Sequence, residues 1–166
     1  MPCGIIPYKS FSKFFGLITY FDKKETKVYN IWRHLYRWHF SKLLQIDPKS
    51  TENLIALGTI FEKLFLRSMN QLYIHLRKLE IFPLDVAWDW MATFFIGKLE
   101  IDQCFWLIDR IMGFDTLHIL PILALGVFKY YEKAVLKMND KQNVIDLVGR
   151  IGQLNLLELV NNYLYG

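Results

Sequence analysis

The sequence is poor in the residues that build disulfide frameworks and metal centres. Its 166 residues include two cysteines, Cys3 and Cys104, which lie far apart and do not form a C-x-x-C pair. Its four histidines are scattered without the spacing of metal ligands: His34, His39, His75 and His118. We therefore expect no disulfide, no metal site and no cofactor, and a cytoplasmic protein from a reducing compartment.

Signals for export and for a membrane span are also lacking. The N-terminus has no uninterrupted apolar run followed by a small-residue cleavage site. The longest apolar run, residues 117–128, is shorter than the roughly 20 residues that a spanning helix needs. Because a helix over this run would be apolar nearly all round, we expect it to be buried in the middle of a helical domain.

The sequence contains none of the common catalytic motifs. A Gly-rich phosphate loop, H-E-x-x-H, G-x-S-x-G and an EF-hand loop are all absent. Asp102 and Asp109 lie seven residues apart, and helix-capping or ion-pair roles fit them better than paired-carboxylate catalysis. No residue is therefore a catalytic candidate.

Helical periodicity dominates what is present. The chain is 53% hydrophobic and 16% aromatic, and alternation with a period of two is hard to find. We predict one all-α domain, a helical array. The spacing predicts a first helix over residues 27–45 that ends at Asp47-Pro48, and a second periodic stretch from Leu54 to Leu79. Ser68 to Gln71 has capping-box form, so we expect a break near Ser68.

Glycine, proline and acidic residues divide the rest of the chain. They predict helices over residues 83–97 and 100–113, each closed by a glycine. Asp115 is expected to cap the following helix. Pro121 should either kink that helix or shift its true start downstream. After a turn at Asn139-Asp140, residues 141–165 are expected to form one or two short helices divided around Gly149–Gly152.

Positive charge gathers at the N-terminal end. Residues 1–49 carry nine Lys or Arg and three acids, a charge of +6, so the remainder of the +4 chain carries −2. In the first helix, Trp32, Leu35, Tyr36 and His39 share one face, while Arg33 and Arg37 share another.

This pattern favours a packed helix with a solvated basic ridge. Base stacking and an interfacial membrane helix are the alternatives. The candidate partner-binding residues are Lys23, Lys24, Arg33 and Arg37, for an acidic protein or an anionic membrane surface. Nucleic acid fits this modest total charge poorly.

Several segments, in order along the chain, match one known pattern. They are Val28–Tyr36, Thr59–Leu64, Leu72–Leu76, Trp88–Phe95 and Trp106–Arg110, the last two within the stretch from Pro83 to Gly126. Together they resemble the C-terminal half of a TBC domain, the fold of many Rab GTPase-activating proteins, and among these the member-19 branch. The resemblance implies a partial TBC domain over residues 5–147 with a helical tail at 148–166. It also implies a Rab GTPase as partner and a place in membrane traffic, at the periphery of endomembranes.

The same resemblance bears on activity. TBC proteins accelerate GTP hydrolysis with an arginine finger from I-x-x-D-x-x-R and a glutamine finger from Y-x-Q, both N-terminal to the matched region. Neither motif occurs in this chain, so no catalytic residue carries over. We expect a GTPase regulator, not itself a hydrolase, with impaired activity as an isolated chain. The alternatives are a non-catalytic module that binds a GTPase, another TBC protein or an acidic membrane, and a fragment of a longer product.

Overall fold

The chain folds into helices that form two groups. The computed structural model describes residues 11–45 and 49–164. The N-terminal lobe consists of α1 (Phe11–Ile18), α2 (Glu25–Leu35), the π-helix η1 (Tyr36–Phe40) and α3 (Ser41–Leu43). The main body consists of α4 (Leu54–Ser68), α5 (Asn70–Lys78), α6 (Pro83–Ala92), α7 (Ile101–Phe114), α8 (Ile119–Val135), α9 (Lys141–Val148), the 3-10 helix η2 (Ile151–Gln153) and α10 (Leu156–Leu164). The predicted all-α class is confirmed.

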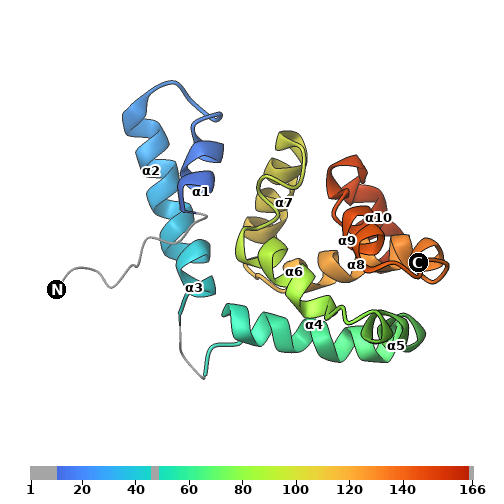
Figure 1. Cartoon of the computed structure of the whole chain (residues 1–166). Coiled ribbons are helices and arrows are strands. Elements are labelled where there is room, and N and C mark those ends of the chain that lie inside the picture. The colour runs from blue at the N-terminus through green and yellow to red at the C-terminus, as the bar shows by residue number, and fades with distance from the viewer. Residues whose placement is uncertain (1–10, 46–48, 165–166) are drawn as a thin grey trace.

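Helix α8 lies at the centre of the main body. It packs against α4, α6, α9 and α10, and Figure 1 shows these helices gathered around it while the lobe stands to one side. The buried residues of α8 include Leu120, Leu123, Val127 and Phe128, so the expected central apolar helix is confirmed. Pro121 lies in the first turn, where its missing N–H leaves no helical hydrogen bond unmade. The helix therefore starts late, as predicted, instead of kinking.

The first predicted helix is present but is not one regular α-helix. After Leu35 the chain forms the π-helical turn η1 before α3 ends at Leu43. The face predicted to pack does so, since Leu35 and His39 are buried. The π-helical turn was not predictable from periodicity, because the spacing of apolar residues there fits an ordinary helix equally well.

The break near Ser68 is confirmed, but the capping box is wrong. The Ser68 hydroxyl donates back to the carbonyl of Leu64 at 2.7 Å, and α5 begins after Met69 without a side-chain cap. The cap that the sequence reading missed is at the start of α4. There the Asn53 side chain accepts a hydrogen bond from the Ala56 N–H at 2.8 Å.

Two predicted helix ends are wrong. Helix α6 ends at Ala92, five residues before Gly97, because Phe94 and Phe95 both adopt left-handed backbone and turn their rings inward. Helix α7 ends after Gly113, and Asp115 is its left-handed C-cap with φ of 47°. Asp115 therefore closes the preceding helix, and it does not cap α8, whose N-cap is His118.

The C-terminal prediction holds within the described residues. Asp140 caps α9 by accepting from the Asn143 N–H at 2.8 Å, and η2 separates α9 from α10. Helix α10 packs against α8, and Leu156 and Leu159 are buried in the same core. Outside the described residues lie Cys3, Asp47-Pro48, Tyr165 and the first six residues of the predicted 5–147 domain.

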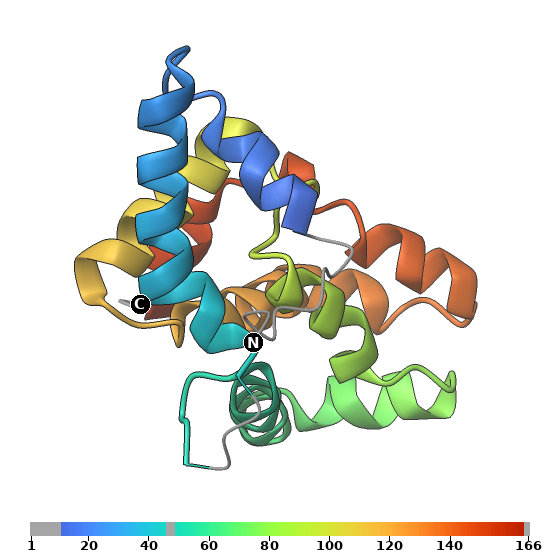
Figure 2. The ribbon, with the colours of Figure 1, turned by 90° about the vertical axis from the view of Figure 1, so that its left-hand side faces the viewer.

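Aromatic rings take part in the contact between the lobe and the main body, whose buried residues belong to one hydrophobic core. Phe14 of α1 and Phe40 of η1 both meet the ring of Phe94, with centroids 5.1 and 4.7 Å away. Further along, Phe21 contacts Phe105 of α7 at 4.5 Å. Figure 2 shows the hairpin of α1 and α2 rising away from α4 and α5, so one long side of α2 is left to solvent.

Candidate partner-binding site

The four predicted basic residues lie along the outer edge of the N-terminal lobe. Lys23 and Lys24 are in the turn between α1 and α2, Arg33 is on α2 and Arg37 is in η1. All four side chains are exposed. Among the residues that the structure describes, none of the four makes an ion pair. Their charges are therefore available to a partner.

The two arginines face solvent because the other side of α2 is needed for packing. Val28 and Leu35 are buried, and the Trp32 ring stacks on Tyr36 with centroids 5.1 Å apart. Arg33 and Arg37 project from the opposite side, one turn apart, as the sequence predicts. The Arg37 guanidinium lies 5.8 Å from the centroid of the Trp38 ring.

The turn that carries the two lysines is fixed by Asp22. The Asp22 carboxylate accepts a hydrogen bond from the Lys24 N–H at 2.8 Å and pairs with the Lys27 ammonium at 3.1 Å. The Lys24 N–H, followed by the Lys27 side chain, holds the pKa of Asp22 below its usual range. Asp22 thus pairs with Lys27, whereas Lys23 and Lys24 make no ion pair among the described residues.

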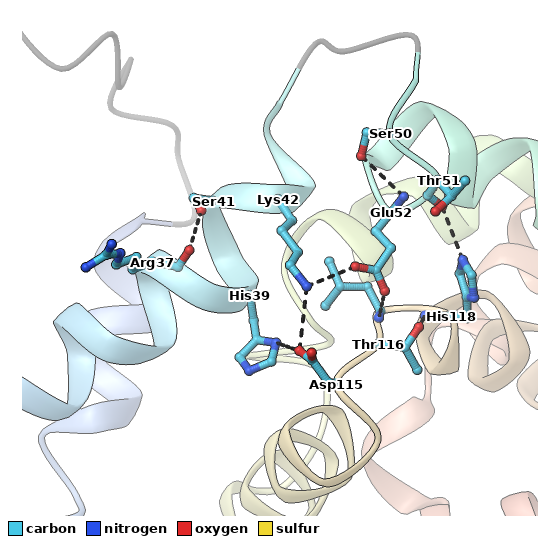
Figure 3. Close-up of polar contacts among 11 residues, drawn as sticks. Arg37, His39, Ser41, Lys42, Ser50, Thr51, Glu52, Asp115, Thr116 and His118 are labelled. Atoms are coloured by element: carbon cyan, nitrogen blue, oxygen red, sulfur yellow. Dashed lines mark hydrogen bonds and ion pairs between the residues drawn. The ribbon is translucent and has the colours of Figure 1, made fainter.

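Behind this surface, charged side chains connect the lobe to the main body, as Figure 3 shows. The Lys42 ammonium lies 3.1 Å from a carboxylate oxygen of Glu52 and 3.6 Å from one of Asp115. The same Asp115 oxygen lies 3.9 Å from Nδ1 of His39. We call His39, Lys42, Glu52 and Asp115 the Lys42 cluster. It joins η1 and α3 to the segment before α4 and to the end of α7.

Glu52 is the most connected member of the Lys42 cluster. Its second oxygen accepts the Leu117 N–H at 3.0 Å. Burial raises the pKa of Glu52, but hydrogen bonds from the Thr116 side chain, Leu117 and Lys42 outweigh it, so the net pKa is lowered. Glu52 is therefore an anion that fixes the loop between α7 and α8.

His39 is the buried member of the Lys42 cluster. Its Nδ1 has no hydrogen-bond partner within the described residues. Burial, followed by the charge of Lys42, lowers the pKa of His39, and Asp115 opposes this only partly. The imidazole is therefore neutral near pH 7. Sequence reasoning placed His39 on the packed face but missed the cluster, because its members are up to 76 positions apart in the chain, from residue 39 to residue 115.

The described residues offer little further reactive chemistry. Among the described residues, no group of three or more His, Cys, Asp or Glu is placed to hold a metal ion. Burial raises the pKa of the Cys104 thiol to about 11, which makes it unreactive. No described helix is long and apolar enough to cross a membrane. Arg110 lies against the Trp106 ring on α7, 5.2 Å from its centroid, far along the chain from the basic edge.

Comparisons with known proteins agree with the helical architecture. The profile of the Rab-GTPase-TBC domain family matches residues 11–136, which run from α1 to the end of α8. TBC1 domain family member 19 from Homo sapiens is 29% identical over 164 residues. That alignment covers 99% of this chain and 31% of the relative, so the chain spans about a third of the relative's length. No solved structure matches the chain. The family match covers most of the helices described above, and the chain therefore belongs to the Rab-GTPase-TBC domain family.

Proposed function

We propose that this chain is a regulator of Rab-type small GTPases that acts in membrane traffic. The observation that carries the proposal is the family match over residues 11–136. A cytoplasmic location at the periphery of endomembranes belongs to the same proposal. The predicted division into a partial TBC domain at residues 5–147 and a tail at 148–166 is proposed with it.

We propose further that the isolated chain accelerates GTP hydrolysis weakly or not at all. An arginine finger against the transition-state phosphates is worth about 10³ to 10⁵ in rate for GTPases. The sequence has neither I-x-x-D-x-x-R nor Y-x-Q. No ion pair among the described residues fixes the exposed Arg33 or Arg37 side chain, and the Arg37 guanidinium lies 5.8 Å from the centroid of the exposed Trp38 ring.

A GTP-hydrolysis assay with a panel of purified Rab GTPases tests this proposal. We expect no acceleration by the wild-type chain. Acceleration that disappears in Arg33→Ala or Arg37→Ala, but persists in Arg67→Ala, would identify a substitute finger and overturn the claim. Arg67 is a suitable control because it is an exposed arginine on α4, outside the lobe.

The second candidate is a non-catalytic binding module, favoured by the four exposed basic residues, which make no ion pair with any residue that the structure describes. Its partner would be a GTPase, another TBC protein or an acidic membrane surface. Binding through Lys23, Lys24, Arg33 and Arg37 should weaken as salt rises and when their charges are reversed. Binding that is insensitive to both changes would exclude this electrostatic form.

A further inference from the structure

The solvent side of α2 and η1 carries aromatic as well as basic side chains. We call Tyr29, Arg33, Arg37 and Trp38, with Lys23 and Lys24 at the N-terminal end, the basic strip. Tyr29 is 53% exposed and Trp38 is 50% exposed. On a helical projection the two arginines lie opposite the buried Val28 and Leu35, with Tyr29 on one flank and Trp38 on the other. Large aromatic rings therefore border both sides of a positive ridge.

The charge of the strip is balanced only in part by nearby acids, since Glu25 follows Lys24 directly. The sequence has no Asp or Glu between Glu25 and Asp47. Asp22, at the end of the strip, is already paired with Lys27 at 3.1 Å. The 11 residues of α2 and 5 of η1 give the strip a length of about 24 Å at about 1.5 Å per residue. A complementary partner must offer negative charge over that whole length.

The shape of the strip narrows the choice of partner. It is the convex side of one helix. Two surface hollows among the described residues lie away from it, one between Met138 and Arg150 and the other at the C-terminal end of α7. The apolar face of α2 is used for packing inside the lobe, so this helix does not embed itself in hydrocarbon. A flat surface with laterally adaptable charge fits such a strip better than a rigid pocket does.

We propose that the basic strip docks the chain on an anionic lipid bilayer. Arg33, Arg37 and the lysines face the acidic headgroups, and the polar-tipped rings of Tyr29 and Trp38 lie at headgroup depth, where such rings are enriched. This inference deepens the proposed binding role of the four basic residues and rests on it. It adds the two aromatic anchors and the orientation of the lobe toward the membrane.

Vesicle co-sedimentation tests the proposal with defined probes. The purified full chain is mixed with vesicles of phosphatidylcholine alone or of phosphatidylcholine with phosphatidylserine, at low and high salt. We expect binding to the anionic vesicles that falls as salt rises, and no binding to the neutral ones. Each basic side chain near such a surface contributes about fivefold to partitioning, so Arg33→Glu with Arg37→Glu should weaken binding at least about 25-fold.

A matched control separates the strip from net charge. Lys133→Glu with Lys137→Glu changes two exposed lysines, also four residues apart, one in the last turn of α8 and one just after it. Both double variants lower the formal charge from +4 to 0, because two positive side chains become negative. Equal losses in the two variants would overturn the strip as the docking surface. Circular dichroism shows whether the charge-reversed variant is folded. If it is not, Arg33→Gln with Arg37→Gln removes the two positive charges without introducing negative ones.

Fluorescence quenching tests the aromatic part. Brominated lipids in the anionic vesicles should quench a fraction of the tryptophan emission, and that fraction should be lost in Trp38→Phe. Quenching that Trp38→Phe leaves unchanged would overturn the proposed orientation.

A further comparison separates this proposal from the function on which it rests. If the chain ignores anionic vesicles but binds a Rab GTPase in a way that Arg33→Glu with Arg37→Glu abolishes, the strip is a protein interface. The membrane proposal then fails while the proposed function stands. If neither vesicles nor GTPases bind, both fail.

Discussion

Phe94 and Phe95 illustrate how burial overrides a residue's backbone preference. Their φ angles are 52° and 59°. For a residue with a side chain, left-handed backbone costs about 1–2 kcal/mol. Both rings are buried, at 1% and 0% exposure. Burying a phenylalanine side chain contributes about 1.5–3 kcal/mol, which offsets the strain. The early end of α6 therefore follows from packing and not from a helix-stop signal.

Truncating Phe94 should be costly, because its ring fills the contact between the lobe and the main body. We expect Phe94→Ala to lower the free energy of unfolding by about 3–5 kcal/mol, as measured by urea denaturation. Phe114→Ala is the control, since that ring is 62% exposed, and it should change stability by less than about 0.5 kcal/mol. Similar losses in the two variants would contradict the role given to Phe94.

Of the polar side chains at the two ends of α4, only Asn53 is a cap, so substitutions at Asn53 and Ser68 should differ in cost. Asn53 accepts a backbone N–H at 2.8 Å, whereas the Ser68 hydroxyl only donates back into the helix that it ends. Asn53→Ala should therefore cost about 1 kcal/mol, and Ser68→Ala should cost close to nothing. Thermal unfolding of both variants, side by side, measures the difference. A larger loss in Ser68→Ala would restore the capping box that the sequence suggested.

At the scale of elements, the Lys42 cluster makes the docking of η1 and α3 depend on pH. The groups that face His39 are Lys42 on α3, His34 on α2, Asp115 after α7 and Glu52 before α4. The pKa of His39 is lowered in the folded protein from its ordinary 6.5, so the folded state prefers the neutral ring. Its contribution to stability is complete above pH 6.5 and is lost as the pH falls from there toward the folded pKa.

We expect the urea midpoint to fall as the pH drops below 6.5, and His39→Gln to flatten that fall, because a glutamine does not titrate. Glu52 affects stability at lower pH than His39 does. Its pKa is depressed below the ordinary 4.5, so its contribution is present above that pH and is lost in stronger acid. An unchanged slope in His39→Gln would contradict this assignment.

The centres of the helices could be predicted from the sequence, whereas several of their ends could not. Apolar spacing located α4 and the long apolar run located α8, because α4 buries one face and α8 most of its circumference. The acidic start and the glycine near the end located α7. The ends of α6 and α7 depend on Phe94, Phe95 and Asp115, whose left-handed backbone is set by contacts with distant segments. The basic edge was predictable because helical spacing alone separates Arg33 and Arg37 from the packed face. The Lys42 cluster was not, since periodicity carries no information about long-range pairs.

At the scale of the whole molecule, the helices of the lobe and of the main body pack mainly within their own group, and fewer contacts join the two groups. The extensive helix contacts of the lobe are internal, and those of the body centre on α8. Between them lie the Phe14, Phe40 and Phe94 contact, the Phe21 and Phe105 contact, and the Lys42 cluster. Regions with few tertiary contacts open at lower free energy than the global unfolding of the core. The lobe, which carries the basic strip, should therefore be the less protected part of the molecule.

Amide hydrogen exchange tests this difference directly. We expect the amides of α2 and α3 to exchange faster than those of α8, whose residues are largely buried. Lys42→Gln removes the pairs with Glu52 and Asp115, at 3.1 and 3.6 Å. A loss of about 1 kcal/mol should speed exchange in the lobe about fivefold, with α8 unchanged.

Lys129→Gln serves as the control, because it removes an ion pair between Lys129 and Glu132 on the surface of α8 and should leave the lobe as it was. Equal acceleration of the lobe and α8 in Lys42→Gln would mean that they unfold as one unit. A partner that docks on the basic strip would then stabilise the entire fold. If exchange accelerates in the lobe alone, the lobe opens separately, and such a partner would stabilise only the lobe.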